Sequence, residues 1–74
     1  MNNRVLDTSR LLCPMPVIKT QQMVNSLAAG DTLEVTFTDP GAAHDIPAWC
    51  RVNGHRVLEL EQHDRGGRIL LQVG

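Results

Sequence analysis

Two prolines spaced two residues apart, Pro14 and Pro16, directly follow Cys13, and this spacing restricts how the chain can fold around them. Proline is tolerated in the first turn of a helix, because the N–H groups there have no partner within the helix. The pair therefore predicts a rigid helix start, with Cys13 at or just before the N-cap. A thiol in this place faces unpaired N–H groups and the positive end of the helix dipole, and both favour the thiolate. The sulfur of Cys13 is therefore the candidate reactive atom.

The chain after these prolines has the pattern of a helix from Pro14 to Ala29, with Gly30 as a left-handed stop. Its apolar face consists of residues at spacings of three and four, namely Val17, Thr20, Val24 and Leu27. A second helix is predicted with Asp39 as its N-cap and Pro40 at its first position, and it runs to about Val52.

Pro47 lies inside this second helical segment, where it removes one ladder hydrogen bond and clashes with the preceding turn. We therefore expect a kink or a restart at Ile46–Pro47. Asp45 is interpreted as the cap of the restarted helix rather than as an acid–base group. Asn53-Gly54 is predicted to close the helix.

Four segments have the composition or alternation of β-strands: 4–7, 32–38, 55–62 and 68–73. In the third segment Leu58 and Leu60 are predicted to face the helices, with Glu59 and Glu61 pointing outward. Residues 63–67 predict a hairpin loop between the last two strands. The order β-α-β-α-β-β then predicts a two-layer α/β sandwich, a four-stranded mixed sheet with both helices on one face.

A chain of 74 residues forms one domain, residues 1–74, with a thin core and no room for a large substrate cavity. The 7 basic and 8 acidic residues nearly balance, and only Trp49 and Phe37 are aromatic, so direct binding of nucleic acid is not expected. No apolar run approaches the ~20 residues that cross a membrane, and no signal-peptide core follows the start. A cytoplasmic location without membrane contact is expected.

Cys13-Pro14-Met15-Pro16, placed after a short strand, resembles the Cys-Pro-x-Pro motif of the TusA/SirA-like sulfur-carrier family. A second stretch, Asp39-Pro40 followed by Asp45-Ile46-Pro47 and Cys50, is similar to the second-helix segment of TusA. In that segment an Asp-Ile-Pro stretch precedes an aromatic residue and a cysteine. The size and the element order also fit, so the resemblance covers essentially the whole chain.

The resemblance implies a function and partners. Members of the family accept sulfane sulfur as a persulfide on the motif cysteine, here Cys13, and pass it to a cysteine of a partner protein. The implied donor is a cysteine desulfurase or a rhodanese, and the implied acceptor is a TusD/DsrE-type protein. The pathway is either tRNA thiolation or dissimilatory sulfur oxidation. The chain is then a sulfurtransferase-type carrier without a cofactor, and its partner enzymes supply most of the catalysis.

Four residues are predicted to support Cys13: Pro14, Met15, Pro16 and Lys19. The prolines present the sulfur rigidly, with little reorganisation on binding a partner. Met15 offers an adaptable apolar contact, and an isolated exposed apolar residue is an equal alternative. Lys19 is the best placed of three cations, with Arg10 and Arg51, to stabilise a thiolate or to contact an acidic partner, and solvated surface charge is the alternative.

Cys50 shares a helix face with Ile46 and Trp49 and is predicted to be a small core residue, with a relay cysteine as the alternative. His44, Cys50 and His55 match no standard zinc spacing and lack a fourth ligand, so no metal is expected. The alternative function is a non-catalytic interaction or regulatory module, which does not depend on the thiol of Cys13.

Overall fold

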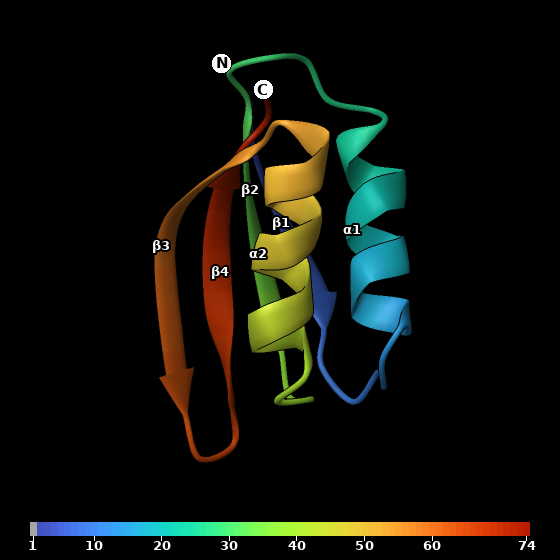
Figure 1. The fold of residues 1–74 in the computed structure, drawn as a ribbon, viewed down its shortest axis with the longest axis vertical. Helices are drawn as coiled ribbons and strands as arrows, with labels where there is room; N and C mark the ends of the chain where they lie inside the picture. The colour runs from blue at the N-terminus through green and yellow to red at the C-terminus, as the bar shows by residue number, and fades with distance from the viewer. Residues whose placement is uncertain (1) are drawn as a thin grey trace.

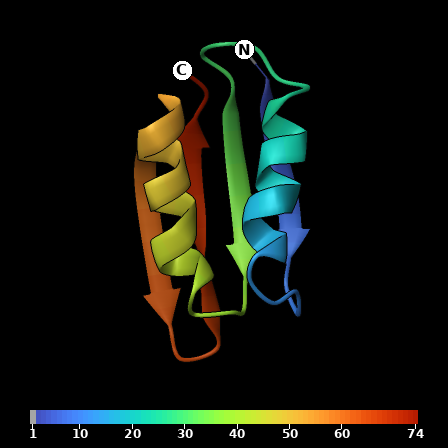
Figure 2. The ribbon, with the colours of Figure 1, turned by 45° about the vertical axis from the view of Figure 1, so that its right-hand side comes forward.

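The computed structural model describes residues 2–74, in which four strands form one sheet that carries two helices (Figure 1). The elements are β1 (Asn3–Thr8), α1 (Met15–Val24), β2 (Thr32–Phe37), α2 (Ala42–Asn53), β3 (Arg56–His63) and β4 (Gly66–Gln72). The strand order is β1-β2-β4-β3, with β1 and β2 parallel and the other neighbouring pairs antiparallel. Both helices lie on the same face of the sheet (Figure 2). The predicted two-layer α/β sandwich with a mixed sheet is confirmed.

Strands β1 and β2 are parallel and each is followed by a helix, so α1 and α2 begin at the same end of the molecule (Figure 1). The strands pair in register from Asn3 opposite Thr32 to Thr8 opposite Phe37, which brings their carboxyl ends level. The two segments that precede the helices, residues 9–14 and 38–41, are hydrogen-bonded to each other.

The core lies between the sheet and the helices. Alternate residues of β2 and β4 point into it, as their patterns predicted, and α2 contributes a stripe at a spacing of four. These side chains are 2% exposed or less: Leu33, Val35, Phe37, Ala42, Ile46, Cys50, Ile69 and Leu71. Half-buried apolar side chains, including Leu6, Val17 and Trp49, pack against this cluster. None of the helices formed by residues 2–74 is long and apolar enough to cross a membrane.

Helix α1 ends at Val24, so the predicted end at Ala29 with Gly30 as its stop was wrong. Beyond Val24 the chain continues in tighter turns, in which the N–H of Leu27 bonds to the carbonyl of Val24. Leu27 still packs against the core. The helical spacing of apolar residues in the sequence therefore continues beyond the end of the helix. Gly30 has φ 93° and lies in the turn that leads into β2.

Helix α2 starts at Ala42 with Gly41 as its N-cap, so the prediction of Asp39 as N-cap was wrong. The helix runs as one element through Pro47, and the predicted restart with Asp45 as its cap was also wrong. Proline removes only one ladder hydrogen bond. The burial of Ile46 and Cys50 on either side of Pro47 holds the helix together. Its predicted end is confirmed, because Gly54 is a left-handed C-cap with φ 79°.

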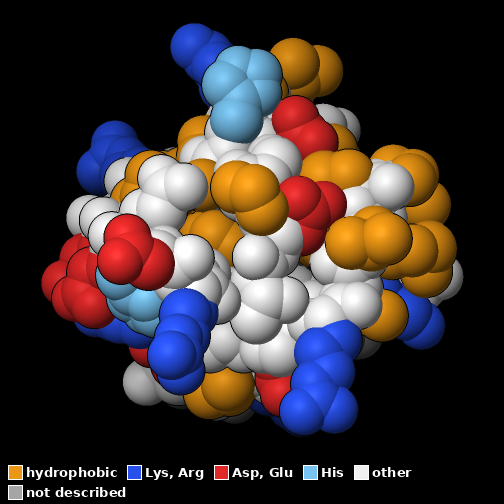
Figure 3. Space-filling view, turned by 90° about the horizontal axis from the view of Figure 1, so that it is seen from below, with side chains coloured by type: hydrophobic (Ala, Val, Ile, Leu, Met, Phe, Trp, Pro, Cys, Tyr) orange, Lys and Arg blue, Asp and Glu red, His pale blue; other side chains and the backbone are white. Residues whose placement is uncertain are grey.

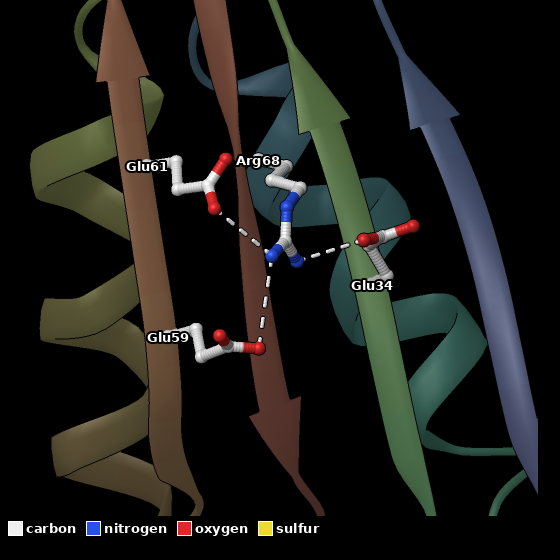
Figure 4. Close-up of polar contacts among 4 residues, drawn as sticks. All are labelled: Glu34, Glu59, Glu61 and Arg68. Carbon is white, nitrogen blue, oxygen red and sulfur yellow. Dashed lines mark hydrogen bonds and ion pairs between the residues drawn. The ribbon is translucent and has the colours of Figure 1, made fainter.

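On β3 Leu58 and Leu60 are 43% and 45% exposed, so neither is a buried core residue. Leu60 pairs with the buried Ile69 and so lies on the helix face of the sheet as predicted, on the edge strand. The pairing of β3 with β4 shifts between Val57 and Glu59, as at a β-bulge. Val57, before the shift, is the residue that packs against the core. After the shift Glu59 and Glu61 point outward as predicted, and with Glu34 they surround Arg68 on the open face of the sheet (Figure 4).

Candidate functional site

Cys13 is exposed and lies in the turn between β1 and α1. Pro14 is the N-cap of α1, so Cys13 stands just before the N-cap, as the sequence predicted. The N–H of Met15 bonds to the carbonyl of Leu12 at 2.8 Å and closes the turn that carries the cysteine. The sulfur of Cys13, the candidate reactive atom, is therefore presented on a hydrogen-bonded turn at the end of the molecule where both helices begin.

Two carboxylates from the second β-α unit reach the cysteine. Asp39 Oδ2 accepts a hydrogen bond from the backbone N–H of Cys13 at 2.7 Å, and Asp39 Oδ1 accepts one from the N–H of Gly41 at 3.0 Å. Asp45 Oδ2 accepts a hydrogen bond from Cys13 Sγ at 3.1 Å. The site therefore combines a thiol from before α1 with carboxylates from before and within the first turns of α2.

These carboxylates reverse the predicted ionisation of Cys13. The hydrogen bond to Asp45, followed by that with Asp39 and by their negative charges, raises the pKa of the Cys13 thiol to about 12. The prediction that the helix start favours the thiolate was wrong, because it considered the N–H groups of α1 without the carboxylates of the neighbouring segment. The same contacts hold the pKa values of Asp39 and Asp45 below their ordinary value of 3.8. In the free protein Cys13 is a thiol at neutral pH.

A histidine adjoins the carboxylate that holds the thiol. His44 Nδ1 lies 3.3 Å from Asp45 Oδ1, and the His44 side chain is 87% exposed. The three side chains form a chain of contacts in the order Cys13, Asp45, His44. This differs from a cysteine–histidine pair, in which the imidazole touches the sulfur and takes its proton.

The predicted supporting residues differ in their placement. Pro16 is fully buried in the first turn of α1, whereas Pro14 and Met15 are exposed beside Cys13. Lys19 is exposed on α1, and no ion pair or hydrogen bond joins it to Cys13 within the part of the chain that the structure describes. The backbone N–H of Arg10 bonds to Thr38 Oγ1 at 2.7 Å, so Arg10 helps to join the two segments that precede the helices.

Apolar side chains flank the site. Leu12, Met15 and Ile18 are 73%, 38% and 37% exposed, and all three belong to the turn before α1 or to its first turns. Seen from the end at which the helices begin, apolar side chains gather beside acidic ones (Figure 3). No cavity or cleft is present in residues 2–74, so Cys13 meets any reactant at the open surface.

The residues considered as metal ligands are not brought together. Cys50 lies in the core, fully buried, as predicted for a small core residue, and burial raises its pKa to about 11. His55 stacks at an angle on Trp49, with ring centroids 5.0 Å apart. Over the described range 2–74, no group of three or more histidine, cysteine or acidic side chains is arranged to hold a metal ion.

The functional residues that the sequence reasoning missed are Asp39 and Asp45, which were both interpreted as helix caps. A signal for them was present. Parallel strands followed by helices place both helix starts at one end of a sheet, so acidic residues just before and within the second helix lie near a cysteine just before the first.

Comparison with known proteins agrees with this fold. Residues 4–73 match the family model described as sulfurtransferase TusA. The chain is 47% identical over 62 residues to the sulfur carrier protein TusA of Pseudomonas putida strain GB-1, covering 84% of this chain and 76% of that protein. It is 45% identical over 65 residues to YrkI of Bacillus subtilis strain 168, covering 88% and 84%.

A solved structure supports the fold at greater sequence distance. The crystal structure of a SirA-like protein from Desulfitobacterium hafniense superposes with a TM-score of 0.84 at 19% identity, covering 96% of this chain and 97% of that one. On the family match over nearly its whole length and on these relatives, the chain belongs to the TusA family of sulfur carrier proteins.

Proposed function

We propose that this protein carries sulfane sulfur as a persulfide on Cys13 and transfers it to a cysteine of a partner protein. The observation that carries the proposal is the exposure of Cys13 on a turn at the end of the molecule, in a chain of the TusA family. Sulfur relay is an attack of one sulfur on another and follows the logic of thiol–disulfide exchange. An exposed sulfur at the surface suits reaction with groups held in another protein's site.

The step is balanced without an oxidant. A donor persulfide, R–S–S⁻, and Cys13–SH give Cys13–S–S⁻ and R–SH. The S–S bond of the donor breaks, a new one forms at Cys13 Sγ, and the Sγ proton ends on the donor sulfur. Delivery to an acceptor cysteine is the same reaction with this protein as the donor. The carrier is restored after each cycle, and partner enzymes supply most of the catalysis.

The surface around Cys13 fits a partner protein. Exposed Leu12 and Met15 offer apolar contacts, and Pro14 and Pro16 hold the turn that presents the sulfur. Lys19 lies on the exposed side of the same helix and is available to an acidic group of a partner. We propose a cysteine desulfurase or a rhodanese as donor and a TusD/DsrE-type protein as acceptor, with residues 1–74 acting as one domain in the cytoplasm. The route, tRNA thiolation or sulfur oxidation, depends on those partners.

The test is sulfur loading measured by intact mass. The protein is incubated with glutathione persulfide, and we expect the mass of one or more sulfur atoms to be added. Cys13→Ser is expected to abolish the addition, and Cys50→Ser, which removes the buried thiol, is the matched control that keeps it. No gain of mass in the wild type, or a gain that survives Cys13→Ser, contradicts the proposal.

A further inference from the structure

The sulfur of Cys13 has negatively charged surroundings. Sγ lies 3.1 Å from Asp45 Oδ2, and Asp39 is bound to the backbone N–H of the same cysteine at 2.7 Å. His44 contacts Oδ1 of Asp45, the oxygen that does not bond to the sulfur, and the first turn of α1 contains no acidic residue. Among residues 2–74 the charged groups that act on the sulfur are therefore Asp39 and Asp45, and His44 contacts Asp45.

Loading changes the charge at this position. Cys13 enters the transfer as a neutral thiol that donates to Asp45, and it leaves as the persulfide anion of the balanced step. The added sulfur lies about 2 Å beyond Sγ and places its negative charge close to the same carboxylate. Asp45 thus gains a hydrogen bond in the empty state and a like-charge repulsion in the loaded state.

We propose that Asp45 makes this protein a weak holder of sulfur, stabilising the empty thiol and destabilising the bound persulfide anion so that sulfur passes on to an acceptor. The inference rests on the proposed function. Asp45 acts on the reacting sulfur through charge and one hydrogen bond. Because the balance of empty and loaded states is an equilibrium, the effect appears in the loading constant whatever the donor.

The size of the effect follows from the geometry. Two unit charges about 5 Å apart in water change an equilibrium by about fourfold. The hydrogen bond that the thiol donates to Asp45 is lost on loading and adds to this bias. Removing the charge of Asp45 is therefore expected to shift the loading constant by about tenfold toward the persulfide.

The experiment measures this constant directly. Wild type and Asp45→Asn are each equilibrated with glutathione and glutathione persulfide, and the loaded fraction is measured by intact mass. Asparagine has nearly the same size and still accepts a hydrogen bond, so the substitution removes the charge and the strengthening that the charge gives to the bond. Glu59→Gln is the matched control, since it removes one negative charge from the open face of the sheet (Figure 4). Asp45→Glu keeps the charge and is expected to stay nearer to the wild type than Asp45→Asn.

The pH profile separates a charge effect from a structural one. Above about pH 8.5 the glutathione product ionises and pulls the reaction toward loaded carrier. Wild-type Cys13 does not ionise until about pH 12, so the wild-type constant rises with pH over this range. In Asp45→Asn the Cys13 thiol also ionises earlier, and the rise is expected to be smaller.

Each outcome bears on a different claim. A tenfold gain in loading for Asp45→Asn, with Glu59→Gln unchanged, is the expected result. Equal constants for Asp45→Asn and wild type, or an equal shift in Glu59→Gln, overturn this inference and leave the proposed function standing. No uptake of sulfur at Cys13 by wild type overturns the proposed function, and the inference with it.

Discussion

The carboxylate of Asp39 accepts the backbone N–H of Cys13 at 2.7 Å, and this bond joins the segment before α1 to the segment before α2. The other oxygen of Asp39 accepts the N–H of Gly41, just before α2 starts. One side chain thus fixes two helix starts that are separated by a whole β-α unit. The position of the Cys13 sulfur relative to Asp45 depends on this bridge.

Asp39→Asn is expected to be less stable than wild type at neutral pH and to approach it in acid. The hydrogen bonds from Cys13 and Gly41 hold the pKa of Asp39 below its ordinary value of 3.8. A group with a lowered folded-state pKa contributes stability above its unfolded pKa, and the contribution is lost as the pH falls through the folded value. Urea unfolding between neutral pH and about pH 3 measures the difference. Asp64→Asn, in the exposed β3–β4 loop, is the control, and a difference that persists undiminished in acid contradicts the prediction.

Cys13 is expected to react slowly with iodoacetamide at neutral pH and to gain about tenfold in rate per pH unit, because only the thiolate attacks. With a pKa of about 12 the increase continues well beyond the range in which an ordinary thiol is already ionised. Peptide mapping after brief labelling follows Cys13 separately from Cys50. A rate that levels off near pH 8.5, as for an ordinary cysteine, contradicts the predicted ionisation.

The sequence predicted the architecture correctly because each strand and helix has a local pattern. Such local patterns, which involve only residues close together in the sequence, are the alternation in β2 and β4 and the prolines at the start of α1. Its errors occur where tertiary contacts decide. Leu27 keeps the helical spacing in a turn that is no longer helix. The register of β3 shifts between Val57 and Glu59, and on this edge strand Leu58 and Leu60 stay exposed.

The candidate site was predicted in part for the same reason. Cys13 was found because its two prolines are adjacent in sequence. The carboxylates were assigned to local helix capping, whereas in the structure Asp39 and Asp45 bind a residue 26 and 32 positions away. The ionisation of the thiol depends on these distant partners, and so local reasoning predicted its direction wrongly.

Cys50→Ser is expected to destabilise the protein without affecting sulfur loading at Cys13. Cys50 is fully buried among apolar side chains, and a hydroxyl placed there without a partner costs about 1 to 3 kcal/mol in the free energy of unfolding. Urea unfolding measures the loss, and intact mass measures the loading below the unfolding transition. Loss of loading in folded Cys50→Ser would show that Cys50 takes part in the relay.

Arg68→Met is expected to lower the stability of the sheet at low salt. Arg68 on β4 lies 2.8 Å from Glu34 of β2, 3.2 Å from Glu61 and 3.7 Å from Glu59 of β3 (Figure 4). Methionine keeps much of the apolar stem but leaves the three carboxylates to repel one another across neighbouring strands. The loss is expected to exceed that of Glu59→Gln and to shrink as salt screens the charges. Thermal unfolding at two salt concentrations measures it, with Arg65→Met in the loop as control, and a loss independent of salt contradicts the role of charge.

Gly41→Ala is expected to lower the pKa of Cys13 while every charge in the site is kept. A Cβ at Gly41 falls 2.9 Å from Cys13 Sγ, closer than a carbon and a sulfur normally approach. The backbone at Gly41 has φ −61° and ψ −30°, which alanine adopts freely, so the fold is expected to stay intact. Side chains occupy staggered rotamers, so the exposed thiol relieves the clash by turning to another rotamer, which takes Sγ away from Asp45.

The rate at which iodoacetamide labels Cys13, followed by peptide mapping as the pH is raised, measures the change in Gly41→Ala separately from Cys50, whose own pKa is raised to about 11. We expect ionisation below the wild-type pKa of about 12, since the bond to Asp45 is the largest cause of that value. Gly54→Ala is a control for glycine replacement away from the site, because nothing lies within 4 Å of a Cβ there, although its φ of 79° strains alanine. An unchanged pKa in folded Gly41→Ala contradicts the claim that the contact between Cys13 and Asp45 sets the ionisation of the sulfur. A lowered pKa shows that geometry, with the charges unaltered, controls it.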